Sequence, residues 1–195
     1  MKKSQNWKAG ALSNKIFMKD EVDSLISDEL KIWCGRTLGP IPLPEPISAS
    51  DLRRYIDATD DRNPLWLDDD CARSVGYRSR IIPPAMIAEL YRRSEGSTGT
   101  HSDSLWEAMP LPRDYSESRN AQAEFEWFDP VYVGDRLNVT HKIIDIVARK
   151  IRSGVGIFVT REMVFRGEQG NLILRVRQTS VKLRKRDAPV DEGAS

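Results

Sequence analysis

YIDATDDRNPLWLD, residues 55–68, is the stretch that decides the fold of this 195-residue chain. Its centre, Asp61-Arg62-Asn63-Pro64, combines residue types that are common in turns, and a turn is the simplest interpretation of these four positions alone. The stretch begins at the end of a predicted helix and runs into three consecutive aspartates, residues 68–70. Its meaning therefore depends on the segments on either side.

Two short helices are predicted around this turn. Ser48 or Ser50 can cap a helix over about residues 51–58, since a serine oxygen accepts from the free N–H groups of the first turn. A second helix is expected over about residues 68–75, because aspartates at its start interact favourably with the helix dipole. The stretch therefore connects two helices.

A third helix is predicted to begin at Pro83 and Pro84, where proline is tolerated because the first N–H groups have no helical partner. Ala85, Met86 and the apolar residues that follow indicate that this is a buried central helix. Residues 94–120 are rich in Ser, Gly, Thr, Pro and charge, and they predict a long loop.

The last third of the chain is predicted to form long strands. Val, Ile, Phe and Thr are frequent in four segments with short connections between them, which indicates an antiparallel meander. These segments are residues 121–129, 136–148, 155–166 and 172–184. Earlier in the chain, residues 39–46 carry alternate prolines, as in an extended edge segment, and residues 20–33 suggest a short helix. Helices followed by strands favour an α+β fold, with a helix packed on one curved sheet.

Composition excludes several classes of function. The net charge of +1 gives no general attraction to nucleic acid or to a membrane surface. Cys34 and Cys71 do not form a C-x-x-C pair, and the aspartates lack the spacing of an EF-hand loop, so we expect no metal site. The cysteines are expected to be reduced thiols. We find no apolar stretch long enough to span a membrane and no signal-peptide pattern, and these observations together favour a cytoplasmic protein.

The stretch at 55–68 resembles the signature of the MaoC-like (R)-specific enoyl-CoA hydratases, in which Gly-Asp-x-Asn-Pro-Leu-His follows a tyrosine and a short helical end. Asp61, Asn63, Pro64 and Leu65 match this signature. Asp60 stands where the family has glycine, and Trp66 stands where it has histidine.

Two further segments extend the resemblance. Residues 72–82 look like the family's lead into its central helix, and residues 128–137 resemble its "PV-x-x-GD-x-L" turn between two strands. The chain looks most like the N-terminal halves called FAS1-like dehydratases, which include substrate-holding subunits of heterodimeric hydroxyacyl dehydratases. The resemblance implies a hot-dog fold, a long antiparallel sheet wrapped around a central helix. It implies a domain over residues 35–185, between an N-terminal extension at 1–34 and a flexible tail at 186–195.

In the family, an aspartate and a histidine hold one water, and together they move the proton at Cα and the hydroxyl at Cβ of a thioester. Histidine suits this work because it both takes and gives a proton near neutral pH. The indole N–H of Trp66 only donates a hydrogen bond, so Asp61 is predicted to be vestigial or supporting.

A second departure concerns the start of the central helix, where the family has His-Gly and backbone N–H groups polarise the thioester carbonyl. Pro83 and Pro84 occupy these positions, and proline has no N–H. Losing one such donor typically lowers the rate by about 100- to 1000-fold. Both the proton-handling group and one stabilising donor are therefore missing.

The resemblance implies a subunit that holds an acyl-CoA or acyl-carrier-protein thioester and pairs, as a hot-dog dimer, with a catalytic MaoC-like chain. We expect no cofactor. The isolated chain is expected to be inactive. Together with its partner it is expected to form an enoyl-CoA hydratase, which is a hydro-lyase. The predicted substrate-binding residues are Asn63, Trp66, Pro83, Pro84, Ala85 and Met86.

Two alternatives remain open on the sequence. One is an active homo-oligomeric hydratase with a rearranged site that uses Asp61 and His101 or His141. The other is a thioester-binding module without catalysis. His101 is expected in a solvated loop and His141 at a surface or interface. The acyl group and the direction of the reaction are not determined by the residues.

Overall fold

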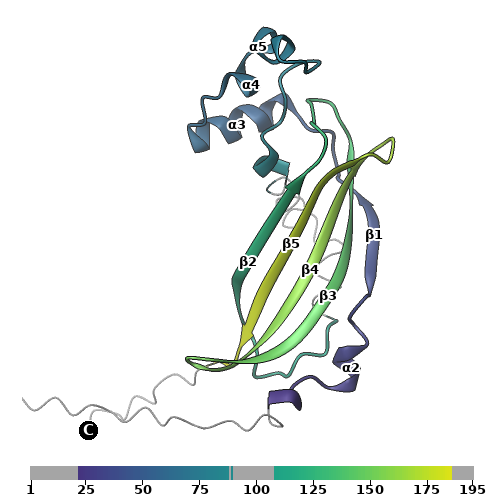
Figure 1. Cartoon of the computed structure of the whole chain (residues 1–195), viewed down its shortest axis with the longest axis vertical. Helices are drawn as coiled ribbons and strands as arrows, with labels where there is room; N and C mark the ends of the chain where they lie inside the picture. Colours follow the sequence, from purple (N-terminus) through teal and green to yellow (C-terminus); the bar gives the residue numbers. More distant parts are fainter. Residues whose placement is uncertain (1–21, 88, 90–107, 186–195) are drawn as a thin grey trace, which may run out of the picture.

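The structure is a computed structural model that describes residues 22–87, 89 and 108–185. A long twisted sheet forms its body (Figure 1). All neighbouring strands are antiparallel, in the order β1-β3-β4-β5-β2. The strands are β1 (Thr37–Pro42), β2 (Glu117–Trp127), β3 (Leu137–Ile151), β4 (Gly154–Gly167) and β5 (Leu172–Leu183).

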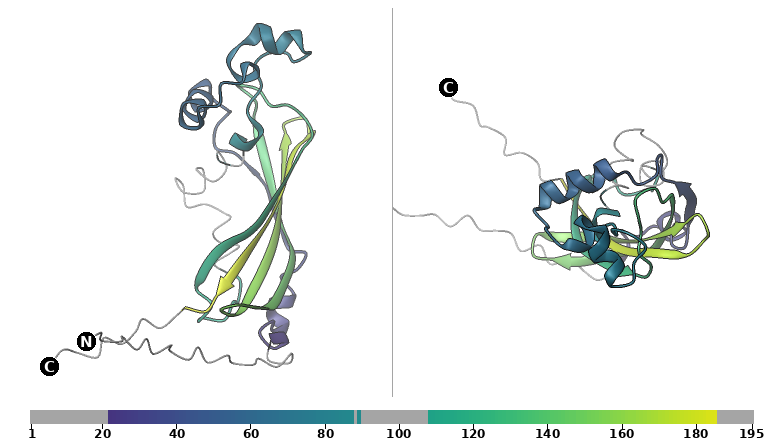
Figure 2. Two further views of the ribbon diagram at one scale, coloured as in Figure 1. Left: turned by 60° about the vertical axis from the view of Figure 1, so that its left-hand side comes forward. Right: turned by 90° about the horizontal axis from the view of Figure 1, so that it is seen from above.

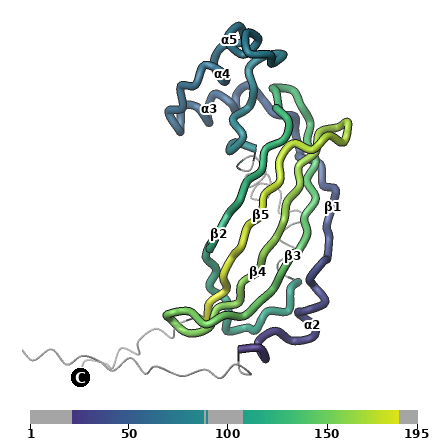
Figure 3. Tube along the Cα trace, in the orientation of Figure 1, coloured from purple at the N-terminus to yellow at the C-terminus, as the bar shows by residue number. Residues whose placement is uncertain are grey.

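The helices lie at the two ends of this sheet (Figure 3). The short α2 (Asp28–Lys31) is at one end, and three helices gather beyond the other: α3 (Ala49–Thr59), α4 (Pro64–Leu67) and α5 (Asp69–Ser74). Residues 84–87 are helical as well, which confirms the predicted helix start at Pro84. Most of the predicted central helix and His101 lie outside the described residues.

Local sequence signals account for these helix starts. The Ser48 hydroxyl accepts from the backbone N–H of Asp51 at 3.0 Å, so Ser48 rather than Ser50 caps α3. The Asp68 carboxylate accepts from the N–H groups of Asp70 and Cys71 and caps α5. Both caps satisfy donors that have no partner inside the helix.

The predicted strands are confirmed, with two corrections. β2 begins at Glu117, inside the segment predicted to be a loop, because an exposed edge strand is polar and lacks the apolar signal of a buried one. β2 also pairs with β5 instead of its sequence neighbour β3, so only β3, β4 and β5 form a meander.

β1 and β2 are the two edges of the sheet. Pro40 and Pro42 lie in β1, and proline fits an edge because it cannot donate to a further strand. Nine of the eleven residues of β2 are exposed. The free side of β2 therefore presents a row of backbone donors and acceptors next to exposed side chains.

Buried side chains form two clusters on one face of the sheet. The upper cluster lies toward α3 and includes Phe165, Leu174 and Met86. The lower cluster lies toward α2 and includes Ile143, Ile157 and Leu30. Leu30 and Trp33 are buried in it, so residues before 35 contribute to the core, although the domain division remains a prediction.

His141 lies on this same buried face, so its predicted location at a surface or interface is wrong. It is only 2% exposed, and alternate residues of β3, such as Val139 and Ile143, are fully buried on either side of it. Burial, and then the nearby charge of Arg161, lowers the pKa of His141 to about 4. The imidazole is therefore neutral at neutral pH.

Candidate functional site

The turn between α3 and α4 positions the candidate site at the end of the sheet (Figure 2). Asp60 ends α3 with a positive φ of 51°. The left-handed region favours glycine, but aspartate tolerates it better than most residues do. Asp60 can therefore replace the glycine of the Gly-Asp-x-Asn-Pro-Leu-His signature. Its carboxylate also accepts a hydrogen bond from Arg62 Nε at 2.7 Å.

Asn63 caps the four-residue helix α4. Its side-chain oxygen accepts from the N–H of Leu65 at 3.0 Å, and Pro64 follows at the first helical position. The backbone N–H of Asn63 donates to Asp61 Oδ1 at 3.2 Å. The Asp-x-Asn-Pro pattern thus has a structural explanation: it fixes the position of the Asp61 carboxylate relative to α4.

Trp66 reaches back from α4 to Asp61. The indole Nε1–H donates to Asp61 Oδ2 at 2.9 Å, and both side chains are partly buried. Since Asn63 already occupies Oδ1, each oxygen of the carboxylate accepts a hydrogen bond from within the chain. This arrangement holds a carboxylate firmly, but its partner is a group that does not exchange protons near neutral pH.

Tyr55 on α3 lies within the electrostatic reach of this carboxylate. Burial raises the pKa of Tyr55 first, and the charges of Asp61 and Glu89 raise it further. The phenol therefore keeps its proton at neutral pH and is available as a hydroxyl donor beside Asp61. The sequence placed Tyr55 at the start of the signature, but it was not among the predicted binding residues.

The segment from Pro83 to Met86 begins two residues after Ile81, which is hydrogen-bonded to α4. Ile81 N–H donates to Leu65 C=O at 3.1 Å, which ties this segment to the helix that carries Trp66. Met86 N–H donates to Pro83 C=O at 2.9 Å. Neither proline has an N–H, so Ala85 is the first residue of this helical segment with a backbone donor.

Two of the predicted binding residues, Met86 and Trp66, contact the upper cluster. Met86 is buried in it, while Tyr55 and Trp66 are partly buried against it. Pro83 is buried, Pro84 is half-buried and Ala85 is exposed. Asn63 and Asp61 lie beside Trp66 through the hydrogen bonds of the turn.

Residues 33–176 match the family model of the FAS1-like dehydratase domain region. The chain belongs to the FAS1-like dehydratase family. It is 26% identical over 162 residues to a probable enoyl-CoA hydratase alpha subunit of Thermomonospora curvata, a match that covers 80% of this chain. The match covers 51% of that relative, so the chain spans about half of its length.

Solved structures share the fold of this FAS1-like dehydratase chain. The ChsH1–ChsH2 complex from Mycobacterium tuberculosis contains a chain with a TM-score of 0.71 and 19% identity, covering 85% of this chain and 95% of that one. A MaoC-like dehydratase from Rhodospirillum rubrum has a TM-score of 0.58 and 19% identity, covering 78% and 94%. These likenesses identify the architecture as a hot-dog fold.

A groove of about 300 Å³ lies between α3 and α4 of this FAS1-like dehydratase. Leu52, Ile56 and Trp66 give it an apolar floor, and three arginines line it as well. These arginines are Arg53, Arg62 and Arg80. Nothing in the sequence pattern predicted this groove, because the arginines come from three segments that only the fold brings together.

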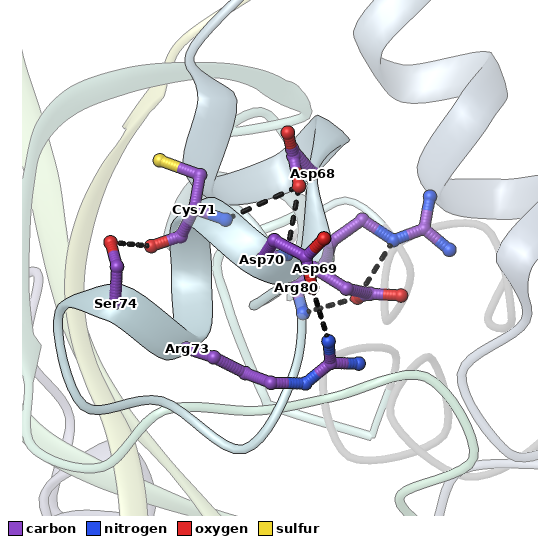
Figure 4. Close-up of polar contacts among 7 residues, drawn as sticks. All are labelled: Asp68, Asp69, Asp70, Cys71, Arg73, Ser74 and Arg80. Atoms are coloured by element: carbon purple, nitrogen blue, oxygen red, sulfur yellow. Dashed lines mark hydrogen bonds and ion pairs between the residues drawn. The ribbon is translucent and has the colours of Figure 1, made fainter.

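Arg80 is held in place by α5 (Figure 4). Asp69 Oδ1 accepts both the backbone N–H of Arg80 at 2.8 Å and its Nε at 3.2 Å. The backbone hydrogen bond from Arg80 is the main cause that lowers the pKa of Asp69. Also on α5, Arg73 pairs with Asp70 at 2.7 Å.

Within residues 22–87, 89 and 108–185, no group of three or more His, Cys, Asp or Glu side chains is arranged to hold a metal ion. In the same part of the chain, no helix has both the length and the apolar character needed to cross a membrane.

Proposed function

We propose that this chain is the substrate-holding subunit of an (R)-specific enoyl-thioester hydratase, and that a catalytic partner of the same fold supplies the proton-handling histidine. The observation that carries the proposal is the hydrogen bond from Trp66 to Asp61. It pairs the Asp61 carboxylate with an indole N–H, which cannot act as a general base or exchange its proton near neutral pH.

Hydration of an enoyl thioester adds a hydroxyl at Cβ and a proton at Cα, so the site must both remove a proton from water and deliver one. A general acid–base group works best when its pKa lies near the working pH. An indole N–H does not lose its proton in this range, which leaves Asp61 without a partner for the two transfers. Pro83 and Pro84 also contribute no N–H to the thioester oxygen.

The exposed edge of β2 supports assembly with a second chain. Nine of its eleven residues are exposed, and its outer side offers backbone groups that a further antiparallel strand would satisfy. Trp127 and Phe128, at the end of this strand, are 50% and 48% exposed. The similar protein from Thermomonospora curvata is named an alpha subunit, and the similar solved structure is a complex of two chains.

The homo-oligomeric alternative loses one of its two candidate histidines. His141 is 2% exposed and has a pKa of about 4, so it is neither accessible to a substrate nor suited to accept a proton at neutral pH. His101 lies outside the described residues. The alternative of a thioester-binding module without catalysis differs from our proposal only in the absence of an active partner.

The test compares three samples in one hydration assay with a medium-chain trans-2-enoyl-CoA: the full chain alone, a short hot-dog chain with intact Asp-x-Asn-Pro-Leu-His and His-Gly, and the two together. A genomic neighbour that carries both motifs is the first partner to use. We expect turnover that requires the partner and rises when this chain is added. Turnover by this chain alone that Asp61→Asn abolishes would overturn the proposal.

A second measurement separates a subunit from a binding module. Titration of an acyl-CoA into the full chain by calorimetry, with and without the partner, reports binding independently of turnover. If the chain binds acyl-CoA but no combination with a motif-bearing partner hydrates the substrate, the result would favour a thioester-binding module without catalysis.

A further inference from the structure

The groove between α3 and α4 combines an apolar floor with three guanidinium groups. Leu52 and Ile56 face it from α3, and Trp66 faces it from α4. Arg53, Arg62 and Arg80 line it from α3, from the turn and from the segment after α5. A ligand that fits this lining has an anionic group carried on a partly apolar stem.

Arg62 and Arg80 are each oriented through Nε. Arg62 Nε donates to Asp60 at 2.7 Å, and Arg80 Nε donates to Asp69 at 3.2 Å. Among the described residues, no side-chain hydrogen bond leaves the terminal Nη atoms of either arginine. The two acidic partners therefore fix each guanidinium group but leave its Nη edge available to bind an anion.

Arg53 is the third positive charge, and within the described parts of the chain it makes neither an ion pair nor a side-chain hydrogen bond. Asp57 is the acidic residue among those lining the groove. Arg62 is 65% exposed and Arg80 is 39% exposed, so the groove is open to water and its charges are partly screened. Binding of an anion here is therefore expected to weaken with added salt.

Trp66 connects the groove to the candidate site. Its indole N–H is bonded to Asp61, while its side chain also lines the groove. A ligand in the groove therefore lies against the same ring that holds the Asp61 carboxylate.

We propose that this groove binds the phosphate-bearing part of phosphopantetheine, the group through which both CoA and acyl carrier proteins hold a thioester. The assignment rests on the proposed function, because thioester binding supplies the ligand class. The phosphate is recognised by the Nη groups of the three arginines, and the dimethyl-substituted carbon chain packs on Leu52 and Trp66. The groove then holds the handle while the acyl group lies toward the site.

The experiment titrates 4′-phosphopantetheine and pantetheine separately into the full chain by calorimetry at low and moderate salt. The test variant is Arg53→Gln/Arg62→Gln/Arg80→Gln. The matched control is Arg73→Gln, because Arg73 forms an exposed 2.7 Å pair with Asp70 much as Arg62 does with Asp60, but it does not line the groove. Thermal unfolding checks that each variant is folded.

We expect pantetheine to bind at least about tenfold more weakly than 4′-phosphopantetheine, because it lacks the charged group to which the arginines would donate hydrogen bonds. The triple variant should lose the same factor, whereas Arg73→Gln should stay within about twofold. If the triple variant does not fold, Arg53→Gln alone is used, because Arg53 has no ion-pair partner among the described residues, and about threefold weakening is expected. No measurable binding, equal binding of the two ligands, or full binding by the variant would overturn the assignment.

Two added ligands identify the source of the handle. Competition by adenosine 3′,5′-bisphosphate together with tighter binding of CoA supports a CoA handle, and tighter binding of a holo acyl carrier protein supports a carrier-protein handle. Hydration by the two-chain complex is measured in parallel. If the complex hydrates its substrate normally but binding does not depend on the phosphate, the groove assignment is wrong and the proposed function stands. If binding depends on the phosphate but no complex hydrates the substrate, only the proposed function is wrong.

Discussion

The indole nitrogen of Trp66 lies 2.9 Å from Asp61 Oδ2 and donates to it across the turn that joins α3 to α4. The two residues are five positions apart, and the cap formed by Asn63 sets the distance between them. Trp66 thus serves two purposes, because it packs against the upper cluster and satisfies a partly buried carboxylate.

Trp66→Phe keeps an aromatic ring but removes the donor. We expect a loss of about 1 kcal/mol in the free energy of unfolding, because Asp61 Oδ2 loses its partner in a partly buried position. A double-mutant cycle of Trp66→Phe with Asp61→Ala, measured by urea unfolding, isolates the pair. The coupling energy should be about 1 kcal/mol, and a value near zero would show that the contact contributes nothing.

Ser48→Ala removes the cap of α3. The hydroxyl accepts from Asp51 N–H and donates to Asp51 Oδ2 at 2.6 Å, so we expect a loss of about 1 kcal/mol in stability. Ser50→Ala is the matched control, because Ser50 is exposed inside the helix and should change stability by less than about 0.5 kcal/mol. Equal effects in denaturant unfolding would contradict the assigned cap.

Features that depend on neighbouring residues were predictable from the sequence. The caps at Ser48 and Asp68 and the helix start at Pro84 follow from hydrogen-bonding groups within a few positions. The long strands follow from runs of β-branched and aromatic residues. α4 was missed because four residues are too few for a helical period, although Asn63-Pro64 is the signal of its start.

Features that depend on contacts between segments far apart in the chain were not predictable from neighbouring residues. β2 is polar because it is an edge, so only its pairing with β5 reveals its full length. The groove arginines meet through the packing of three segments. His141 is different: Val139 and Ile143 already indicate the buried face of β3, and that alternation was a sufficient signal for its burial.

Trp127→Ser tests the exposed end of β2 as the contact with the partner. Trp127 is 50% exposed and stacks on Phe125 with ring centroids 5.8 Å apart, so the change should leave the fold intact. We expect at least about tenfold weaker association with the partner, since aromatic anchors dominate interfaces. Ile32→Ser is the control, because Ile32 is 63% exposed near α2. Sedimentation of mixtures gives both dissociation constants, and equal values would place the contact elsewhere.

His141 makes the stability of the fold dependent on pH. Its pKa is about 4 in the folded chain against an ordinary value of 6.5, because burial, followed by the charge of Arg161, disfavours the imidazolium. Between these two pH values the unfolded chain binds a proton that the folded chain does not. The stabilisation is therefore complete above about pH 6.5 and is lost as the pH falls toward 4, by up to about 3 kcal/mol.

His141→Met removes this titration while keeping an apolar group on the buried face, next to Met163 on β4. Urea unfolding at pH 7.5 and pH 5 should show a smaller loss for His141→Met than for the parent chain, by about 1–2 kcal/mol. Carboxylates titrate in the same window, so the comparison between variants, rather than the slope itself, isolates the imidazole. His101→Ala, which changes the other of the two histidines, should keep the parent slope. If His141→Met and His101→Ala behave alike, the pH dependence arises from other groups.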